Sequence, residues 1–151
     1  MPEKETLERA KQDKREGKAA STQAGEFVRE EIEHVREGKH GARSAKQVIA
    51  IGLSKARRAG VQLAIPEKGT VSEKTREQAK RDTRKGQGAD KGITSASRSR
   101  ASSRRLKREG HSAASKTALS RQARRAAAKR SAASRSRSAK KAAATRKRQE
   151  A

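Results

Sequence analysis

Residues 21–65 read STQAGEFVREEIEHVREGKHGARSAKQVIAIGLSKARRAGVQLAI and contain most of the large apolar side chains of this 151-residue chain. In the first half of this stretch, apolar residues recur at the three- and four-residue spacing of one helix face. They are Ala24, Phe27, Val28, Ile32 and Val35. We therefore predict an amphipathic helix over about 22–37, with Ser21 or Thr22 as its N-cap and Gly38 at its end.

A second helix is predicted over about 45–59, after a short turn. Ser44 is a suitable N-cap, Gly60 ends the helix, and Val61 supplies the apolar contact that accompanies such an ending. The inner face is formed by Ala45, Val48, Ile49, Gly52, Leu53 and Ala56. Because the two faces match and the connection is short, we expect an antiparallel helical hairpin, Phe27 to Ile65. So small a core is marginal alone, which makes a homodimer through the hairpin one expectation.

The segments on either side of the hairpin are polar. Residues 3–18 mix acidic and basic side chains at helical spacing, which predicts a solvated, fraying helix. Residues 70–85 begin with Thr70 and Glu73 at the spacing of a capping box, which predicts a polar helix. The glycine-rich residues 86–92 have the composition of a linker.

Positive charge is concentrated in the C-terminal part of the chain. The formal net charge is +24, and residues 91–151 supply +18 of it, from 20 Lys and Arg against Glu109 and Glu150. Alanine, arginine and lysine favour helices, but neighbouring like charges repel each other. We therefore expect residues 95–109 and 112–148 to be disordered or only nascently helical until a polyanion neutralises them.

These patterns predict an all-α protein in four parts. Residues 1–20 are a solvated charged helix, 21–66 the hairpin core, 67–92 a polar helix and linker, and 93–151 a basic, conditionally helical or disordered arm. Only 30% of the residues are hydrophobic, with one Phe and no Trp or Tyr, so a large filled core is excluded.

The sequence contains a loose internal echo. The segment that begins REGKH at Arg36 has a counterpart that begins REGH at Arg108, and each is followed by a basic, alanine-containing stretch. The spacings differ by several residues. Two explanations therefore stay open: a degenerate second copy of one helix–turn–helix unit, and coincidence in a low-complexity region.

The histidines give no metal-binding signature. His34, His40 and His111 occur without an HExxH motif or a Cys/His cluster, so we predict no metal site and assign them solvated or loop-capping roles. His40 lies beside Lys39 and Arg43 and is also a candidate phosphate donor.

The first predicted helix is rich in carboxylates: Glu26, Glu30, Glu31, Glu33 and Glu37. We expect a solvated acidic face, with an intramolecular mimic of DNA for the basic arm as the alternative. Catalytic carboxylates need a pocket that shifts their pKa values, and the near absence of aromatic residues argues against one. Walker A and GxGxxG motifs are absent as well, so we expect neither enzymatic activity nor a cofactor.

Basic residues are the strongest functional signal. Those of the second helix serve either the helix dipole and solubility or phosphate contact, whereas those of the arm are too numerous for solubility alone. The candidate nucleic-acid-binding residues are Lys46, Lys55, Arg57, Arg58, Arg104, Arg105, Lys107, Arg108, Arg121, Arg124, Arg125, Lys129, Arg130, Lys140, Lys141, Arg146, Lys147 and Arg148.

The absence of aromatic residues from the arm favours phosphate neutralisation over base stacking. The leading hypothesis is a non-enzymatic, largely sequence-independent DNA-binding protein of the bacterial nucleoid. An RNA-binding or ribosome-associated factor is the first alternative, because serine–arginine runs occur at 97–100 and 134–138. Phosphorylation of these serines would weaken binding. A structural adaptor, whose acidic helix docks a partner, is the second alternative.

Disulfides, targeting signals and membrane partners are not expected. The sequence has no cysteine, which excludes disulfides and thiolate metal sites. Its N-terminus has no apolar signal region, and no run approaches the roughly 20 apolar residues of a membrane span. We expect a cytoplasmic protein at the nucleoid, with neither a membrane nor a small-molecule substrate as partner.

The motif REGKHG at Arg36–Gly41, followed by KQVIAIGLSKARRAG at Lys46–Gly60, resembles a bacterial family of small basic proteins that share a domain of unknown function. The segments ERAKQDKREGK at Glu8–Lys18 and LKREGHSAASKTALSRQAR at Leu106–Arg124 are similar to the same family. The arm is similar in composition to histone H1-like bacterial proteins. The first resemblance carries over no functional residue, and the second implies DNA binding through composition alone.

Overall fold

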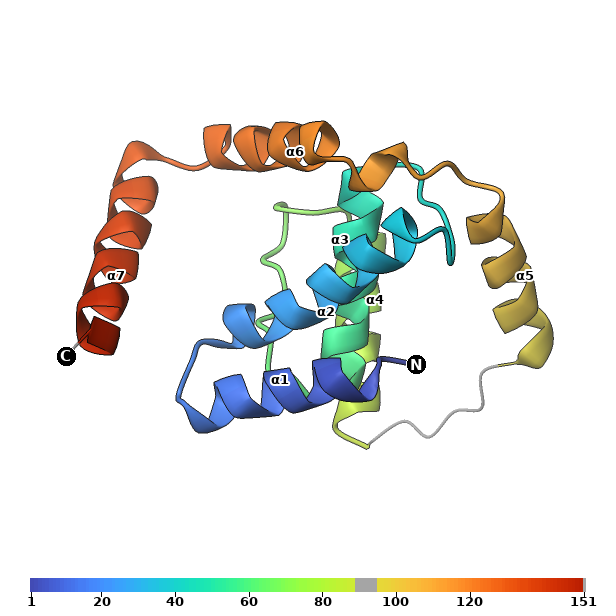
Figure 1. The fold of residues 1–151 in the computed structure, drawn as a ribbon, viewed down its shortest axis with the longest axis horizontal. Coiled ribbons are helices and arrows are strands. Elements are labelled where there is room, and N and C mark those ends of the chain that lie inside the picture. Colours follow the sequence, from blue (N-terminus) through green and yellow to red (C-terminus); the bar gives the residue numbers. More distant parts are fainter. Residues whose placement is uncertain (89–94, 151) are drawn as a thin grey trace. The chain divides into compact units, whose positions relative to one another are not determined.

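The computed structural model describes residues 1–88 and 95–150 (Figure 1). These residues form seven α-helices and one short 3-10 helix, with no β-strand, which confirms the all-α prediction. The helices are α1 (Lys4–Arg15), α2 (Ala20–Arg36), α3 (Ala45–Arg58), α4 (Glu73–Gly86), α5 (Ala96–Lys107), the 3-10 helix η1 (Ser112–Ala114), α6 (Lys116–Ala128) and α7 (Ala132–Glu150). The chain divides into two compact units, Met1–Ser115 and the part from Lys116 onward.

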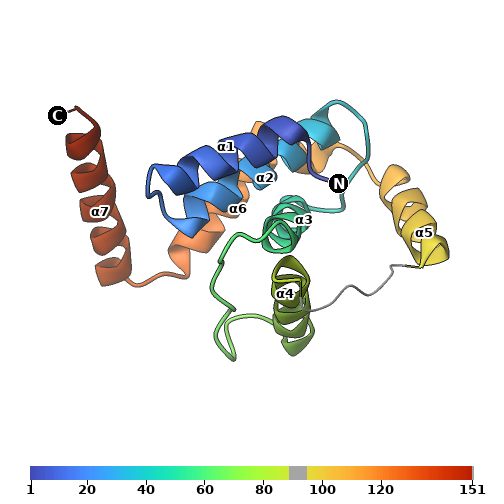
Figure 2. The same cartoon turned by 90° about the horizontal axis from the view of Figure 1, so that it is seen from below.

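The centre of the first unit is the packing of α2 on α3. Figures 1 and 2 show that the two helices cross steeply, so the predicted antiparallel alignment is not confirmed. Gly52 explains the crossing, because a Cβ added there would lie 2.6 Å from the Cα of Val28. The two backbones therefore meet closely at one point. The eight residues that connect the helices are long enough for the helix axes to diverge on both sides of this crossing.

The predicted ends of α2 and α3 are confirmed. Gly38 and Gly60 follow the two helices with φ angles of 76° and 91°, which side chains with a Cβ rarely adopt. The backbone N–H of Val61 donates to the Ala56 carbonyl at 3.0 Å, and Val61 is buried. The Ser44 side chain accepts from the Gln47 N–H at 3.2 Å, which makes it the N-cap of α3.

Two predicted helix starts are wrong. The N-cap of α2 is Ala19, with no side-chain cap, rather than Ser21 or Thr22. The N-cap of α4 is Ser72, whose Oγ accepts from the Thr75 N–H at 3.2 Å, rather than Thr70. In both cases the actual N-cap is an extended residue two or three positions from the predicted one. The sequence pattern of cap residues alone did not identify it.

The N-terminal helix is not solvated on all sides, contrary to prediction. Thr6 and Ala10 of α1 are buried, and α1 packs along α2. Ala10 joins one core cluster with Ala24, Phe27, Ala56 and Val61, and Leu7, Ala20, Leu53 and Leu63 pack against it. A helix with few and mostly small apolar residues therefore extends the core beyond the two central helices.

A second core cluster includes residues from the predicted basic arm. Ala113 and Ala114 are buried with Val35, Ala42 and Val48, and Ile32 packs against them. Three backbone carbonyls hold the segment in place: those of Leu106, Gly110 and Ala114 accept from Gly41 N–H, Ala42 N–H and the Arg36 Nε at 2.9, 3.0 and 2.9 Å. The prediction of an independent arm from residue 93 is therefore wrong, because residues 106–114 complete the first unit. Of the predicted linker, residues 89–92 lie outside the described residues.

The internal echo corresponds to similar local structure. The REG segments that begin at Arg36 and Arg108 each start where a helix ends, in α2 and α5. Each is followed by a buried alanine, Ala42 or Ala113, and then by a serine directly before the next helix. The two turns also contact each other, because the Ala42 N–H donates to the Gly110 carbonyl at 3.0 Å. These similarities favour the repeat explanation over coincidence.

Most of the described part of the arm is helical, in α5, α6 and α7. Apart from half-buried Leu106, the residues of α5 are exposed, and no residue of α6 or α7 is buried. These helices therefore depend on alanine, lysine and arginine propensity rather than on packing. The predicted disorder in the absence of a polyanion is not confirmed.

Substituting Gly52 by alanine is expected to destabilise the first unit by about 1–3 kcal/mol, because the added methyl group would press on the Val28 backbone. Gly25 of α2 is the matched control. A Cβ there meets nothing within 4 Å, so Gly25→Ala should stabilise the protein by about 0.5–1 kcal/mol through helix propensity. Urea denaturation followed by circular dichroism measures both changes. Equal effects of the same sign would contradict the close crossing.

Candidate nucleic-acid interface

The second unit presents most of the predicted binding residues to solvent. Its candidates are all exposed: Arg121, Arg124, Arg125, Lys129, Arg130, Lys140, Lys141, Arg146, Lys147 and Arg148. Residues 116–151 contain 13 Lys and Arg against Glu150 alone, a formal charge of +12. Among the described residues of this unit, none of these cations pairs with a carboxylate, and Arg130 binds only the serine oxygens of Ser134 and Ser138.

The two helices of this unit distribute their charge differently. On α6, Arg121, Arg124 and Arg125 share one face by their three- and four-residue spacing, and Leu119 lies on the opposite side. On α7, basic residues occur on every side. By the helical rise, α6 and α7 are about 20 and 28 Å long, enough for each to follow several phosphates of a duplex.

The four candidates on and after α5 are exposed as well. They are Arg104, Arg105, Lys107 and Arg108. The three arginines among them line a shallow open hollow together with Ala101 and Glu109. Glu109 lowers the positive charge of this hollow and pairs with Arg43 at 3.5 Å. This end of the first unit offers a smaller basic surface than the second unit.

Three of the four candidates on α3 serve the fold instead. Only Lys46 is exposed and without an ion-pair partner among the described residues. Arg58 donates to the buried carboxylate of Asp82 at 2.8 Å and thereby holds α4 on α3. Arg57 is buried, donates to the Ala64 carbonyl at 3.2 Å, and has its pKa lowered by burial. The fourth candidate, Lys55, belongs to a buried network.

That network centres on Glu30 and Glu31, which are fully buried, so the predicted solvated acidic face is wrong at these two positions. Lys55 pairs with Glu30 at 3.1 Å and with Oε1 of Glu31. Burial raises the pKa of Glu30, but hydrogen bonds from the Glu3 N–H, Thr6 and Lys55 outweigh it and hold the pKa below its usual value. These donors therefore favour the ionised form of Glu30 inside the unit.

The other carboxylates of α2 are also engaged. Glu26 accepts from Arg9 at 2.6 Å, Glu33 from Arg29 at 3.1 Å, and Glu37 pairs with Lys39 at 3.1 Å. Few of these charges are free to imitate the phosphates of DNA or to dock a basic partner. The alternatives that depend on an acidic face therefore rest mainly on Glu33 and Glu37, whose side chains are 47% and 58% exposed.

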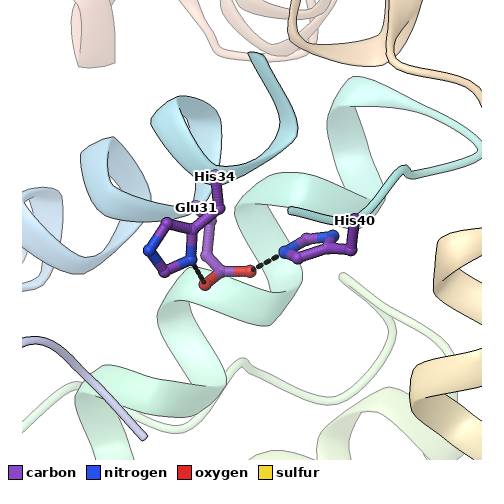
Figure 3. A group of neighbouring side chains, drawn as sticks. All are labelled: Glu31, His34 and His40. Carbon is purple, nitrogen blue, oxygen red and sulfur yellow. Dashed lines mark ion pairs between the residues drawn. The ribbon is translucent and has the colours of Figure 1, made fainter. Parts of the chain in front are cut away.

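Two of the three histidines meet at Glu31 (Figure 3). Nδ1 of His34 lies 3.4 Å from Oε1 of Glu31, and Nε2 of His40 lies 3.2 Å from Oε2. His34 also reaches Glu3, whose pKa falls to about 2 because His34 and Lys39 donate to it. The sequence interpretation missed this grouping. Its signal is the Glu-x-x-His spacing on α2, with His40 two residues beyond Gly38, where the chain turns back.

Comparisons with known proteins add no relative: no family model, no curated protein and no solved structure matches this chain. The resemblance to the bacterial family with a domain of unknown function therefore stays a prediction. No helix in the described part of the chain combines the length and apolar character that a bilayer crossing requires.

Proposed function

We propose that this chain binds the phosphate backbone of double-stranded DNA without reading its sequence, as a non-enzymatic protein of the bacterial nucleoid. One observation carries the proposal: the cations of α6 and α7 are exposed and have no carboxylate partner among the described residues, whereas those on α3 are mostly neutralised within the fold. Basic helices without acidic partners leave a large unpaired charge, and a polyanion is its natural counterpart.

The composition of the interface favours backbone contact. Binding single-stranded bases usually requires aromatic side chains, and the only aromatic residue of the chain, Phe27, is buried in the first unit. Phosphate neutralisation requires only lysine and arginine and releases counterions. The logarithm of the binding constant should therefore fall with the logarithm of salt concentration, with a slope of about −0.9 for each duplex phosphate contacted.

RNA is the competing ligand, because phosphate neutralisation does not distinguish the two polymers. Competition at moderate salt between a labelled DNA duplex and unlabelled structured RNA separates them. Preferential retention of DNA supports the proposal. If unlabelled RNA displaced the labelled duplex at a nucleotide concentration at least tenfold lower than unlabelled DNA needs, the chain would be reassigned to RNA binding.

The arginine face of α6 provides a test by substitution. Replacing Arg121, Arg124 and Arg125 together by glutamine should reduce the salt slope by up to about 0.9 for each lost contact and weaken binding to all duplexes alike. The matched control removes the same charge from α1, through Lys4→Gln, Lys11→Gln and Lys14→Gln, at exposed positions of the first unit. Fluorescence anisotropy with a labelled duplex at several salt concentrations measures both triple variants.

If binding depended on net charge alone, the two triple variants would lose affinity equally, and the assignment to α6 would be wrong. A second contradictory result would be discrimination between duplexes of unrelated sequence. Backbone contact predicts nearly equal affinities for all of them.

A further inference from the structure

The buried charge network contains a group of side chains with unmet bonding capacity. Glu31, His34 and His40 each offer one ligand atom, and these atoms lie within 4.8 Å of one another (Figure 3). Glu31 is fully buried, and Lys55 bonds to its Oε1. Its Oε2 is also buried but accepts no hydrogen bond from the described residues. A buried carboxylate oxygen without a donor is costly and calls for a partner.

The hydrogen bonds on the outer sides of both rings determine what faces Glu31. Nδ1 of His40 lies 3.0 Å from the Gly41 carbonyl, and Nε2 of His34 lies 2.9 Å from Oε1 of Glu3. Both oxygens can only accept, so both outer nitrogens carry hydrogen. In neutral rings, the inner nitrogens therefore direct lone pairs toward the Glu31 carboxylate.

Lone-pair donors held this close together favour a cation, and the two rings face the two oxygens of the Glu31 carboxylate (Figure 3). Metal-ligating histidines almost always donate their other ring N–H to a carboxylate or a backbone carbonyl, which is the arrangement at Glu3 and Gly41. Zinc binds histidine nitrogen and carboxylate oxygen at about 2.0–2.2 Å, so tetrahedral ligand atoms lie about 3.3–3.5 Å apart. The separation of 3.2 Å between Nε2 of His40 and Oε2 of Glu31 is close to that spacing.

We propose that Glu31, His34 and His40 form a binding site for a zinc-class divalent metal ion. Oε2 of Glu31, Nδ1 of His34 and Nε2 of His40 are the ligand atoms, and Glu3 and Gly41 orient the two rings. The site replaces the expectation, drawn from the sequence, that the chain has no metal ligands.

Charge and access are consistent with such an ion. With both rings neutral, the surrounding charged groups sum to −1: Glu3, Glu30 and Glu31 against Lys39 and Lys55. The histidine side chains are 12% and 18% exposed, so the ion can enter and keep water as its fourth ligand. The ring centroids lie 6.2 Å apart with planes at 81°, so the rings are not stacked on each other.

The ion would connect α2 to the turn that leads into α3. This turn also donates the hydrogen bonds that dock residues 106–110. Metal binding should therefore stabilise the first unit, since a ligand that binds only the folded state raises its stability. The proposal concerns the first unit and does not depend on nucleic-acid binding.

The test uses the untagged, chelator-treated full-length chain without nucleic acid, because a polyhistidine tag would bind metal itself. Isothermal titration with Zn²⁺ should give one ion per chain, and Co²⁺ should give the visible absorption of a tetrahedral site. His34→Gln and His40→Gln should each weaken binding at least about tenfold. His111→Gln is the matched control, because His111 is exposed and lies outside the cluster.

Glu3→Gln provides a milder test at an exposed position that should leave the fold intact. It removes the carboxylate that orients His34 and should weaken Zn²⁺ binding about 10- to 100-fold. Nitrogen NMR of the unmodified chain covers the case in which a histidine variant fails to fold. On addition of Zn²⁺, Nδ1 of His34 and Nε2 of His40 should shift, while the His111 nitrogens should not.

Two results would overturn the proposal. One is the absence of saturable Zn²⁺ binding, or binding that His34→Gln and His40→Gln leave unchanged. The other is a nitrogen spectrum in which all four nitrogens of His34 and His40 keep their protons when Zn²⁺ is added. Protonated rings would then be the partners of Glu31, and the cluster would be a purely internal ion network.

Discussion

A chain truncated after Ser115 is expected to lose at least about a hundredfold in affinity for duplex DNA at physiological salt while its first unit stays folded. The deleted residues carry 13 of the 41 basic side chains and only one acidic residue. The first unit keeps its interior, because neither core cluster includes a residue beyond Ala114. Anisotropy of a labelled duplex measures the affinity, and a circular dichroism melt measures the folding.

The position of this cut is decided by the structure. A cut after residue 92, where the composition changes, would also remove Ala113, Ala114 and the carbonyls that bind Gly41 and Ala42. Val35 and Val48 would then be exposed, so that truncation should melt earlier as well as bind less. Undiminished DNA binding by the chain that ends at Ser115 would refute the role assigned to α6 and α7.

Replacing Lys55 by methionine is expected to destabilise the first unit by about 3–5 kcal/mol. The change leaves the buried carboxylates of Glu30 and Glu31 without their shared cation, and an uncompensated buried charge costs this much. Methionine preserves most of the side-chain volume, so lost packing contributes little. Urea denaturation in the presence of a chelator gives the difference in the free energy of unfolding.

The matched control is Lys46→Met on the same helix, where the lysine is exposed, and its effect should stay within about 0.5 kcal/mol. Adding Glu31→Gln to Lys55→Met should restore part of the lost stability, since one buried charge is removed with its partner. If Lys55→Met and Lys46→Met proved equally mild, the buried ion network would not exist in solution. Zn²⁺ should reduce the penalty of Lys55→Met if the proposed metal site forms.

Much of the secondary structure could be predicted because it depends on local chemistry. Gly38 and Gly60 end helices through their backbone freedom, and Ser44 caps the next helix through its hydroxyl. The positions of α2 and α3 follow from the spacing of apolar residues between Phe27 and Ala56. The two misplaced caps show the limit of this approach, since Thr70 and Ser72 satisfy the same pattern and Ala19 begins α2 without any side-chain cap.

The candidate site could be predicted only where residues act alone. The exposed cations of α6 and α7 follow from composition, because nothing in that part of the chain is apolar enough to bury them. The fates of Lys55, Arg57 and Arg58 did not follow, since a lysine near a helix end looks the same whether it faces solvent or a carboxylate 25 residues away. The meeting of Glu31 with His40 was missed for the same reason.

The sequence by itself determined the all-helical class, the ends of the central helices and the basic character of the C-terminal part, because these depend on local backbone preferences and on counting charges. Tertiary structure alone decided that Glu30 and Glu31 are interior ions, that α1 is a packed helix, and that Ala113 and Ala114 belong to the core. Burial depends on what distant segments bring to a side chain. Small alanines and paired charges give no apolar signal before the chain is folded.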